Sequence, residues 1–293
     1  MALEIDYGRD EWREDPAAAH AEAERRIALA AAAEDPADRE AIFFSDLGAL
    51  RAIPPGLGEV VGLQRIEIGF SRVPGSLDAY FGVEPHIENF GAIREAHRLK
   101  RLGLAKCQLS DLQVLSALHE LEDLDLSETQ VKNLDAISEL DCLQTLRLSY
   151  TPVANLSPLA NLTALQNLHL DGTKISDLSP LIWLSQLRTL YIDHTNVADV
   201  SLLLGFPAFT EEHEALLDVR YTPAVVANPG LAAAANTDDY REQAVRVIRY
   251  LKGLTTPEAT DGTPQADDPP PDPAAALRAH VARAPLVLAV RDG

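Results

Sequence analysis

Two short segments carry the side chains whose types and spacing could do chemistry. His169 and Asp171 lie two residues apart in one segment, and Asp193 and His194 are adjacent in another. Residues two apart on a strand share one face, and two close carboxylates can share a divalent cation. The alternative is a pair of solvated acids whose charge is offset by Arg147 and His194. The sequence favours this alternative and predicts no metal site.

No other pattern in the chain indicates catalysis. It contains no HExxH zinc motif, no glycine-rich phosphate loop and no pairing of a nucleophile with a base. Two cysteines are too few for a disulfide framework or a zinc site, and no neighbour of Cys107 would activate its thiol. We therefore expect Cys107 to be a buried structural thiol, and we expect no cofactor and no enzymatic activity in this chain.

An internal repeat sets the elements that must position these residues. Leucine recurs every 22 residues at the start of five successive rows, and eight columns of the rows stay apolar. Such a fixed period is typical of repeat architectures. The first column is Leu99, Leu121, Leu143, Leu165 and Leu187, and the fourth column is Leu102, Leu124, Leu146, Leu168 and Leu190.

The row pattern LxxLxLxxTxVxxLxxLxxLxx is similar to the leucine-rich repeat family and most closely resembles its 22-residue bacterial class. The ninth position, usually Asn or Cys in the family, is Cys107 in the first row and then Thr129, Thr151, Thr173 and Thr195. The resemblance implies an α/β solenoid with a curved parallel sheet on the concave side, short helices or 3-10 turns on the convex side, and helical caps. It is specific for the fold and nearly silent about function.

Each half of a row has its own expected structure. The LxxLxL half alternates with period two, which predicts a short strand whose fourth and sixth side chains point inward. The ninth-position threonine hydroxyls are expected to satisfy backbone groups where the chain leaves the strand. The other half begins a short α- or 3-10 helix, with Ser157 and Ser179 as expected N-caps and Pro158 and Pro180 at the first helical position.

Less regular rows extend the repeat in both directions. Residues 63–73 fit the strand half of a row, and the 36 residues before the next row predict an insertion at 74–98. Residues 43–62 read as a further degenerate row. Downstream, Leu217 takes the fourth column of a last row that follows a longer loop. These rows together predict about eight turns.

Solenoid ends expose their core and need caps. A helix is expected from Pro16 to about Ala33 with Asp15 as its N-cap, and an amphipathic helix at 237–253. The expected segments are an N-terminal helical cap at 1–38, a solenoid at 39–227 with a regular core at 99–208, a C-terminal capping helix at 228–253, a flexible linker at 254–273 and a short helix–strand tail at 274–293. The segment NPG at 228–230 resembles the end of the repeat array in Roco proteins. Their GTPase is not expected here, because the chain has no P-loop.

The outward strand positions of such a solenoid, in columns three, five, seven and eight, form its concave face. Their mixture of Arg, Tyr, His and Asp suits a polar protein contact. The expected partner-binding residues are Arg101, Asp123, Asp125, Arg147, Tyr150, His169, Asp171, Tyr191, Asp193 and His194. The convex side, the caps and the 74–98 insertion are the alternative binding surfaces.

Charge and hydrophobicity narrow the choice of partner. The chain has 25 Lys and Arg against 45 Asp and Glu, a net charge of −20, and no basic stripe, which argues against nucleic acids and anionic membranes. No apolar run approaches a membrane span, and the start is acidic and polar, so we expect a cytoplasmic protein. We expect a non-enzymatic scaffold, adaptor or sensor that binds a protein with a basic patch.

Two alternatives stay open at this point. The chain could be the recognition half of a larger signalling enzyme, Roco-like or similar, with catalysis beyond Gly293. It could also be a secreted, internalin-like effector, although it shows neither a signal nor a sorting motif.

Overall fold

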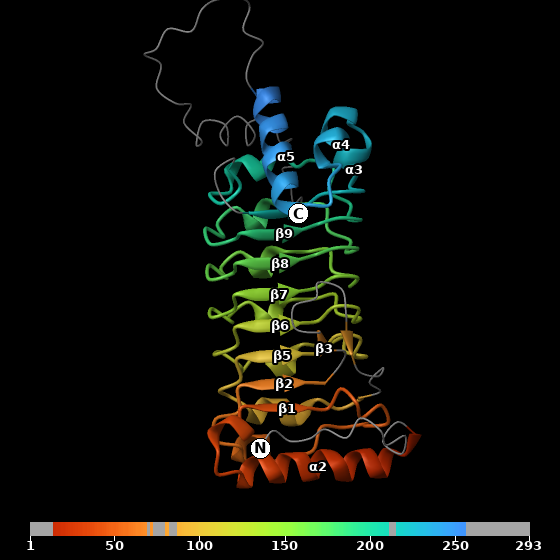
Figure 1. Ribbon diagram of the computed structural model, residues 1–293, viewed down its shortest axis with the longest axis vertical. Coiled ribbons are helices and arrows are strands. Elements are labelled where there is room, and N and C mark those ends of the chain that lie inside the picture. The colour runs from red at the N-terminus through yellow and green to blue at the C-terminus, as the bar shows by residue number, and fades with distance from the viewer. Residues whose placement is uncertain (1–13, 69–70, 73–79, 82–86, 211–214, 256–293) are drawn as a thin grey trace, which may run out of the picture.

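Eight parallel strands stack in chain order along the long axis of the molecule (Figure 1). The structure, a computed structural model, describes residues 14–68, 71–72, 80–81, 87–210 and 215–255. The strands are β1 Ala41–Phe43, β2 Arg65–Glu67, β5 Arg101–Gly103, β6 Asp123–Asp125, β7 Thr145–Arg147, β8 Asn167–His169, β9 Thr189–Tyr191 and β10 Leu216–Asp218. They form one open sheet, which is the expected leucine-rich repeat solenoid.

Helices cover the rest of the solenoid. The α-helices are α2 Pro16–Ala32, α3 Pro223–Val226, α4 Pro229–Ala235 and α5 Tyr240–Thr255. The 3-10 helices are η1 Pro36–Asp38, η2 Leu57–Glu59, η3 Gly91–Glu95, η4 Gln113–Leu115, η5 Asp135–Ile137, η6 Ser157–Leu159, η7 Ser179–Leu181 and η8 Ser201–Gly205. Each turn from β2 to β9 therefore pairs a three-residue strand with a short 3-10 helix, as the row length predicts.

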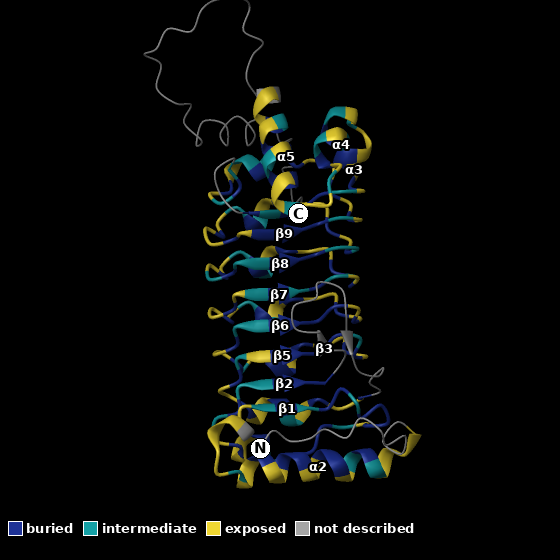
Figure 2. Cartoon of the chain, viewed as in Figure 1, coloured by how far each residue is buried: buried dark blue, intermediate teal, exposed yellow. Residues whose placement is uncertain are grey.

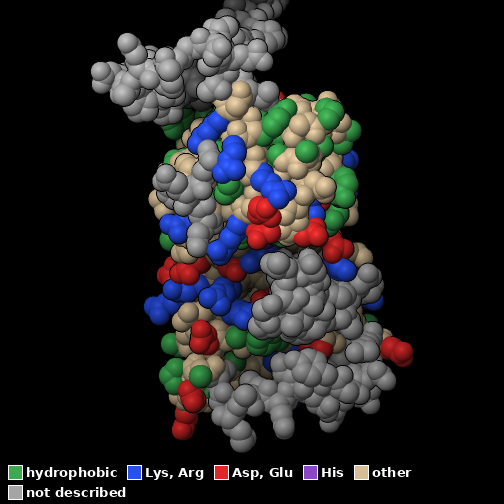
Figure 3. Space-filling view, turned by 45° about the horizontal axis from the view of Figure 1, so that its top comes forward, with side chains coloured by type: hydrophobic (Ala, Val, Ile, Leu, Met, Phe, Trp, Pro, Cys, Tyr) green, Lys and Arg blue, Asp and Glu red, His purple; other side chains and the backbone are tan. Residues whose placement is uncertain are grey.

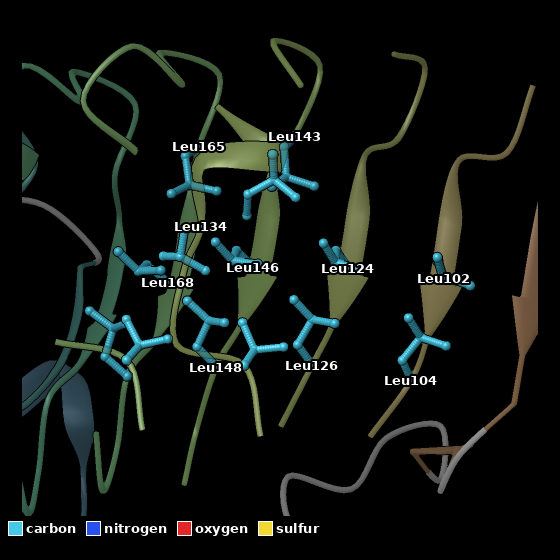
Figure 4. Packing of buried hydrophobic residues seen from close by; sticks show 14 of the residues in the cluster. Leu102, Leu104, Leu124, Leu126, Leu134, Leu143, Leu146, Leu148, Leu165 and Leu168 are labelled. Atoms are coloured by element: carbon cyan, nitrogen blue, oxygen red, sulfur yellow. The ribbon is translucent and has the colours of Figure 1, made fainter. Parts of the chain in front are cut away.

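Strand register follows the leucine columns. Leu124 lies opposite Leu146 and Leu146 opposite Leu168, so their side chains line up across neighbouring strands (Figure 4). The irregular rows keep this register, because Ile66 pairs with Leu102 and Leu217 with Leu190. The predicted columns are confirmed across the sheet.

The aligned columns form one continuous apolar core. It extends from Ala19 of α2 to Leu251 of α5, and Figure 2 shows the buried residues following the strands through the stack. Leu146 and Leu168 are fully buried. Burial of one leucine side chain contributes about 1.5–3 kcal/mol, so the repeated column is the main source of stability.

The threonine column satisfies the backbone within each turn. The hydroxyls donate to the carbonyl three residues earlier at 2.6–2.8 Å, from Thr129, Thr151, Thr173, Thr195 and Thr222 to Leu126, Leu148, Leu170, Ile192 and Val219. All five threonines are buried. The hydroxyls therefore stabilise the exit from each strand by contacts within one turn.

The predicted N-caps Ser157 and Ser179 are wrong. The capping side chain lies two residues earlier, where Asp or Asn accepts a hydrogen bond from the first backbone N–H of the 3-10 helix at 2.8–3.0 Å. These acceptors are Asp111, Asn133, Asn155, Asp177 and Asp199. Ser179 instead donates its own hydroxyl to Asp177. A carboxylate or amide reaches this N–H because it forms an Asx turn.

The irregular rows differ in detail from the expectation. Strand β1 begins at Ala41, so the first row starts before residue 43. The insertion also begins before residue 74, because a second small sheet pairs β3 (Ser71–Arg72) with β4 (Tyr80–Phe81). Ile87 and Ile93 have already returned to the core, so the 74–98 range ends too late. Val73 lies outside the described residues.

Polar side chains of the two terminal helices satisfy the ends of the sheet. Within the sheet, the sixth-column N–H of each turn donates to the fifth-column carbonyl of the next, as Leu148 does to His169. At the last strand Val219 has no further turn, and its N–H donates to the side-chain oxygen of buried Gln243 in α5 at 2.9 Å. At the first strand, the carbonyl of Phe43 accepts from Arg26 of α2 at 2.6 Å. The exposed edges that strands otherwise present are thereby occupied.

Salt bridges hold Arg26 in place. Its guanidinium contacts Asp46 at 2.7 Å and Glu22 at 2.9 Å, and Arg26 and Glu22 are both buried. Burial alone would raise the pKa of Glu22, but hydrogen bonds from Arg25 and Arg26 lower it overall. The helix itself runs from Pro16 with Asp15 as its N-cap, as predicted, and ends at Ala32.

The C-terminal cap has more helices than predicted. Where the sequence indicates a single helix at 228–253, the structure has α4 and α5, preceded by α3. Asp239 explains the break between them, because its side chain accepts from the N–H groups of Arg241 and Glu242 at the start of α5. Helix α5 continues past Gly253 to Thr255. The expected linker beyond it and the tail at 274–293 lie outside the described residues.

Candidate functional site

The outward side chains of the strands form the candidate site, which we call the strand face. Columns three and five of each strand point outward, and column seven lies two residues after the end of the strand. The strand face carries eight of the expected residues, namely Arg101, Asp123, Asp125, Arg147, His169, Asp171, Tyr191 and Asp193. Figure 3 shows Lys and Arg intermixed with Asp and Glu on the visible side of the molecule. The face is therefore polar and of mixed charge.

Arg147 forms a salt bridge with Asp123. Its guanidinium donates to the carboxylate of Asp123 on the neighbouring strand, and the Arg147 side chain is only 17% exposed. The expectation that Arg147 offsets the charges of Asp171 and Asp193 is therefore wrong. Arg101 lies exposed beside this pair and is available to a partner.

A depression of about 110 Å³ lies between β2 and β7, at a place that the sequence did not indicate. At this place column five holds Gly103, and the Glu67 carboxylate fills the space of the missing side chain, since a Cβ added to Gly103 would lie 1.8 Å from it. Burial raises the pKa of Glu67, although its hydrogen bond with Arg65 opposes this. The lining residues are Arg65, Glu67, Arg101, Leu102, Gly103, Asp123, Asp125 and Arg147. The sequence signal for this depression was Gly103, a glycine in a column that otherwise holds larger residues.

The middle of column five is covered, contrary to expectation. Asp125, His169 and Tyr191 are each only 8% exposed. The His169 ring meets the Tyr191 ring edge-on at 4.7 Å between centroids, and Tyr191 contacts Tyr240 of α5 at 4.8 Å. These three residues therefore hold the face together and offer little surface to a partner.

Asp171 and Asp193 approach each other across two turns. The two residues hold the same column of successive turns, and Ser149 donates to Asp171 at 2.9 Å. Burial, followed by the hydrogen bond with Asp193 and its charge, raises the pKa of Asp171 to about 8. The raised pKa keeps a proton on the Asp171 carboxyl near neutral pH, and the expectation of two solvated acids is wrong.

The shared cation weighed from the sequence lacks a third ligand. Among the described residues, no three His, Cys, Asp or Glu side chains form a group that could hold a metal ion. His194 contacts Asp193 through Nδ1 at 2.7 Å, whereas His169 contacts Tyr191. The two histidines thus contact different residues and do not converge on the two carboxylates.

Column eight forms a rim along one edge of the strand face. Its residues adopt a left-handed backbone in six successive turns, with φ of 54–65° at Lys106, Glu128, Tyr150, Gly172, His194 and Tyr221. Two predicted site residues, Tyr150 and His194, therefore lie on the rim and not on the strands. The Tyr150 ring covers Gly172, where an added Cβ would lie 2.5 Å from a ring carbon. The His194 ring stacks on Tyr221 at 4.4 Å.

Helix α5 closes the C-terminal end of the strand face. Asp218 of β10 bonds to Arg220, which lies 5.5 Å from the centre of the Tyr240 ring. Helix α5 packs against β10, and in Figure 1 it rises from the top of the strand stack above β9. The accessible part of the face therefore runs from the depression at β2 to the rim at β9.

The cysteines show no sign of reactivity. Cys107 is buried, and burial raises the pKa of its thiol, as a structural role requires. Cys142 is exposed, and neither cysteine is in a disulfide. In the described part of the chain, no helix has the length and apolarity needed to cross a bilayer.

Comparison with known proteins agrees with the fold. The family model for leucine-rich repeats in two copies matches residues 143–183. A leucine-rich repeat protein of Leptospira interrogans is 25% identical, with a TM-score of 0.54, over 67% of this chain and 46% of that one. Internalin C2 of Listeria monocytogenes is 26% identical, with a TM-score of 0.47, over 66% of this chain and 90% of that one. No curated protein matches the chain.

A second internalin of Listeria monocytogenes is 20% identical over 62% of this chain, with a TM-score of 0.49. The match spans about half of that internalin, 52%, and 46% of the Leptospira protein. Fold and matches together show a leucine-rich repeat solenoid. Proteins of this class are generally protein-interaction modules and are typically not enzymes.

Proposed function

We propose that this protein is a non-enzymatic scaffold or adaptor whose strand face binds a partner protein with a basic surface. The observation that carries the proposal is that the face is fixed before any partner arrives. Arg147 is held by Asp123, Asp171 by Ser149, and Asp193 by the His194 ring. Side chains already in place lose little conformational freedom on binding, which favours affinity.

Charge supports a basic partner. The chain carries a net charge of −20, and the accessible part of the face includes Asp123, Asp171 and Asp193. A basic surface would be attracted over a distance of about 10 Å at moderate salt, which accelerates association. Arg101 adds an exposed guanidinium that can anchor an acidic or aromatic group within the same interface.

We also propose a cellular location, a repeat class and a family resemblance for the C-terminal end. We place the protein in the cytoplasm and its repeats in the 22-residue bacterial class. The Roco-like ending rests on the NPG segment, in which Asn228 caps α4 and accepts from the Tyr250 hydroxyl at 2.8 Å.

A photo-crosslinking experiment tests the strand face. A photoreactive amino acid replaces Asn167 on β8, whose side chain lies on the strand face, and replaces exposed Lys132 between β6 and η5 as a matched control. An extract of the organism that encodes the chain is then irradiated with each variant. The proposal predicts one crosslinked protein from position 167 and none of the same mass from position 132. Crosslinks only from position 132 would place the interface elsewhere.

A further inference from the structure

The rim near β8 and β9 presents three rings to solvent. Tyr150 and Tyr221 are each 62% exposed, and the His194 side chain is 54% exposed. None of these rings can fold away freely. The Tyr150 ring lies over Gly172, and the His194 ring is stacked on Tyr221 and bonded to Asp193. The rings therefore form a fixed aromatic surface of the kind that is enriched at protein interfaces.

The Asp171–Asp193 pair lies directly beside these rings. Asp171 precedes Gly172 in the chain, and Asp193 precedes His194. Two other acids of the strand face have an arginine partner, since Asp123 bonds to Arg147 and Asp218 bonds to Arg220. In the described part of the chain, the groups bonded to the Asp171–Asp193 pair from outside it are the Ser149 hydroxyl and the His194 ring.

This combination suits one kind of ligand group. Two carboxylates can accept the parallel N–H groups of a guanidinium, and tyrosine rings attract the same cation through their faces. We propose that Tyr150, Asp171, Asp193, His194 and Tyr221 bind an arginine side chain from an extended segment of the partner protein. That the arginine belongs to a partner protein rests on the proposed function. The ability of the site to bind a guanidinium does not.

Binding changes the protonation of the pair. Without ligand, the Asp171 carboxyl holds a proton beside Asp193, because burial and the charges of Asp193 and Asp218 oppose a second negative charge. The arriving guanidinium supplies a compensating positive charge. The proton on Asp171 then leaves to solvent, and both carboxylates accept N–H bonds. Arg147 and Arg220 do not compete, since each is bonded to another acid.

A peptide experiment tests the site without knowledge of the partner. The probes are acetyl-Gly-Gly-Arg-Gly-Gly-amide, the same peptide with citrulline, which is isosteric but neutral, and the same peptide with lysine. Titration calorimetry on the full chain at pH 6.5, in two buffers of different ionisation enthalpy, reports affinity and protons released. We expect the arginine peptide to bind about tenfold more tightly than the citrulline peptide and to release close to one proton.

Variants locate the binding. Tyr150→Ala and Asp171→Asn should each weaken the arginine peptide by about three- to tenfold, and Asp171→Asn should abolish proton release. Trp183→Ala removes another exposed ring, and Asp141→Asn another exposed acid, so both should bind like wild type. Circular dichroism confirms that each variant is folded.

The outcomes distinguish the arginine site from the proposed function. Equal binding of the arginine and citrulline peptides overturns the arginine site, even if crosslinking from position 167 still supports a partner protein on the strand face. Tighter binding of the lysine peptide, or displacement of the arginine peptide by millimolar calcium, also overturns an arginine site. Selective arginine binding without any crosslink from position 167 supports the site and contradicts the proposed function.

Discussion

Asp171 and Asp193 hold the same column on successive turns of the solenoid, and burial together with the neighbouring charge of Asp193 raises the pKa of Asp171. Two acids can meet in this way because the turns stack in register, so that one column places its residues side by side. The regularity that builds the core thus also brings two acids together on the outer face, where the raised pKa of Asp171 keeps that carboxyl protonated.

This pair makes the stability of the protein depend on pH. The pKa of Asp171 is raised from 3.8 to about 8, so between these values the folded state binds more protons than the unfolded chain. Stability therefore falls as pH rises through this window. We expect Asp171→Asn to flatten the fall in the melting temperature between pH 5 and pH 9. Thermal melts at stepped pH measure this, and a variant with the wild-type slope would contradict the raised pKa of Asp171.

A control separates this pair from the general charge of the protein. Asp141 is exposed on another surface, so Asp141→Asn removes one negative charge without touching the pair. Its melting temperature should keep the wild-type pH dependence.

Gln243 is predicted to matter as much as a core residue. It is fully buried, and its side-chain oxygen replaces the carbonyl of a missing next turn for the N–H of Val219. Gln243→Leu would leave that N–H without an acceptor, which costs about 1–3 kcal/mol. Urea unfolding followed by circular dichroism measures the change. Gln130→Leu at an exposed position should stay within about 0.5 kcal/mol of wild type.

The carboxylate that starts η7 gives a third prediction. Asp177 accepts from the backbone N–H and from the hydroxyl of Ser179. We expect Asp177→Ala to lower the free energy of unfolding by about 1 kcal/mol, as loss of a helix cap does. In contrast, Ser179→Ala keeps the backbone bond and should cost less. A larger loss for Ser179→Ala in the same urea titration would restore serine as the cap.

The fold could be read from the sequence because its cause is local and repeated. Leucine at fixed intervals defines which residues point inward, and the register of Leu146 with Leu168 follows. The Asx caps were also visible as a column of Asp and Asn, including Asn155 and Asp177, two residues before each expected serine. That signal was missed because the serine–proline pair resembles the start of an ordinary helix.

The site was harder to predict because it depends on contacts between distant segments. Tyr191 is buried by Tyr240, which is 49 positions later in the chain and reaches it only when α5 folds onto the sheet. The depression at Gly103 depends on how Glu67 fills the missing side-chain volume. The column of a residue in the repeat shows neither of these contacts. It therefore indicates which side chains point outward, but not which of them remain accessible to a partner.

The most direct test of a binding strand face measures affinity for the crosslinked partner, once it is purified. Arg101→Glu changes an exposed charge on the strand face, and Lys132→Glu makes the same charge change away from it. Binding is measured by calorimetry for wild type and both variants at about 50 and 300 mM salt. We predict that Arg101→Glu weakens binding at least about tenfold while Lys132→Glu does not, and that wild-type affinity falls at high salt. Equal affinities of the two variants, unchanged by salt, would contradict the account.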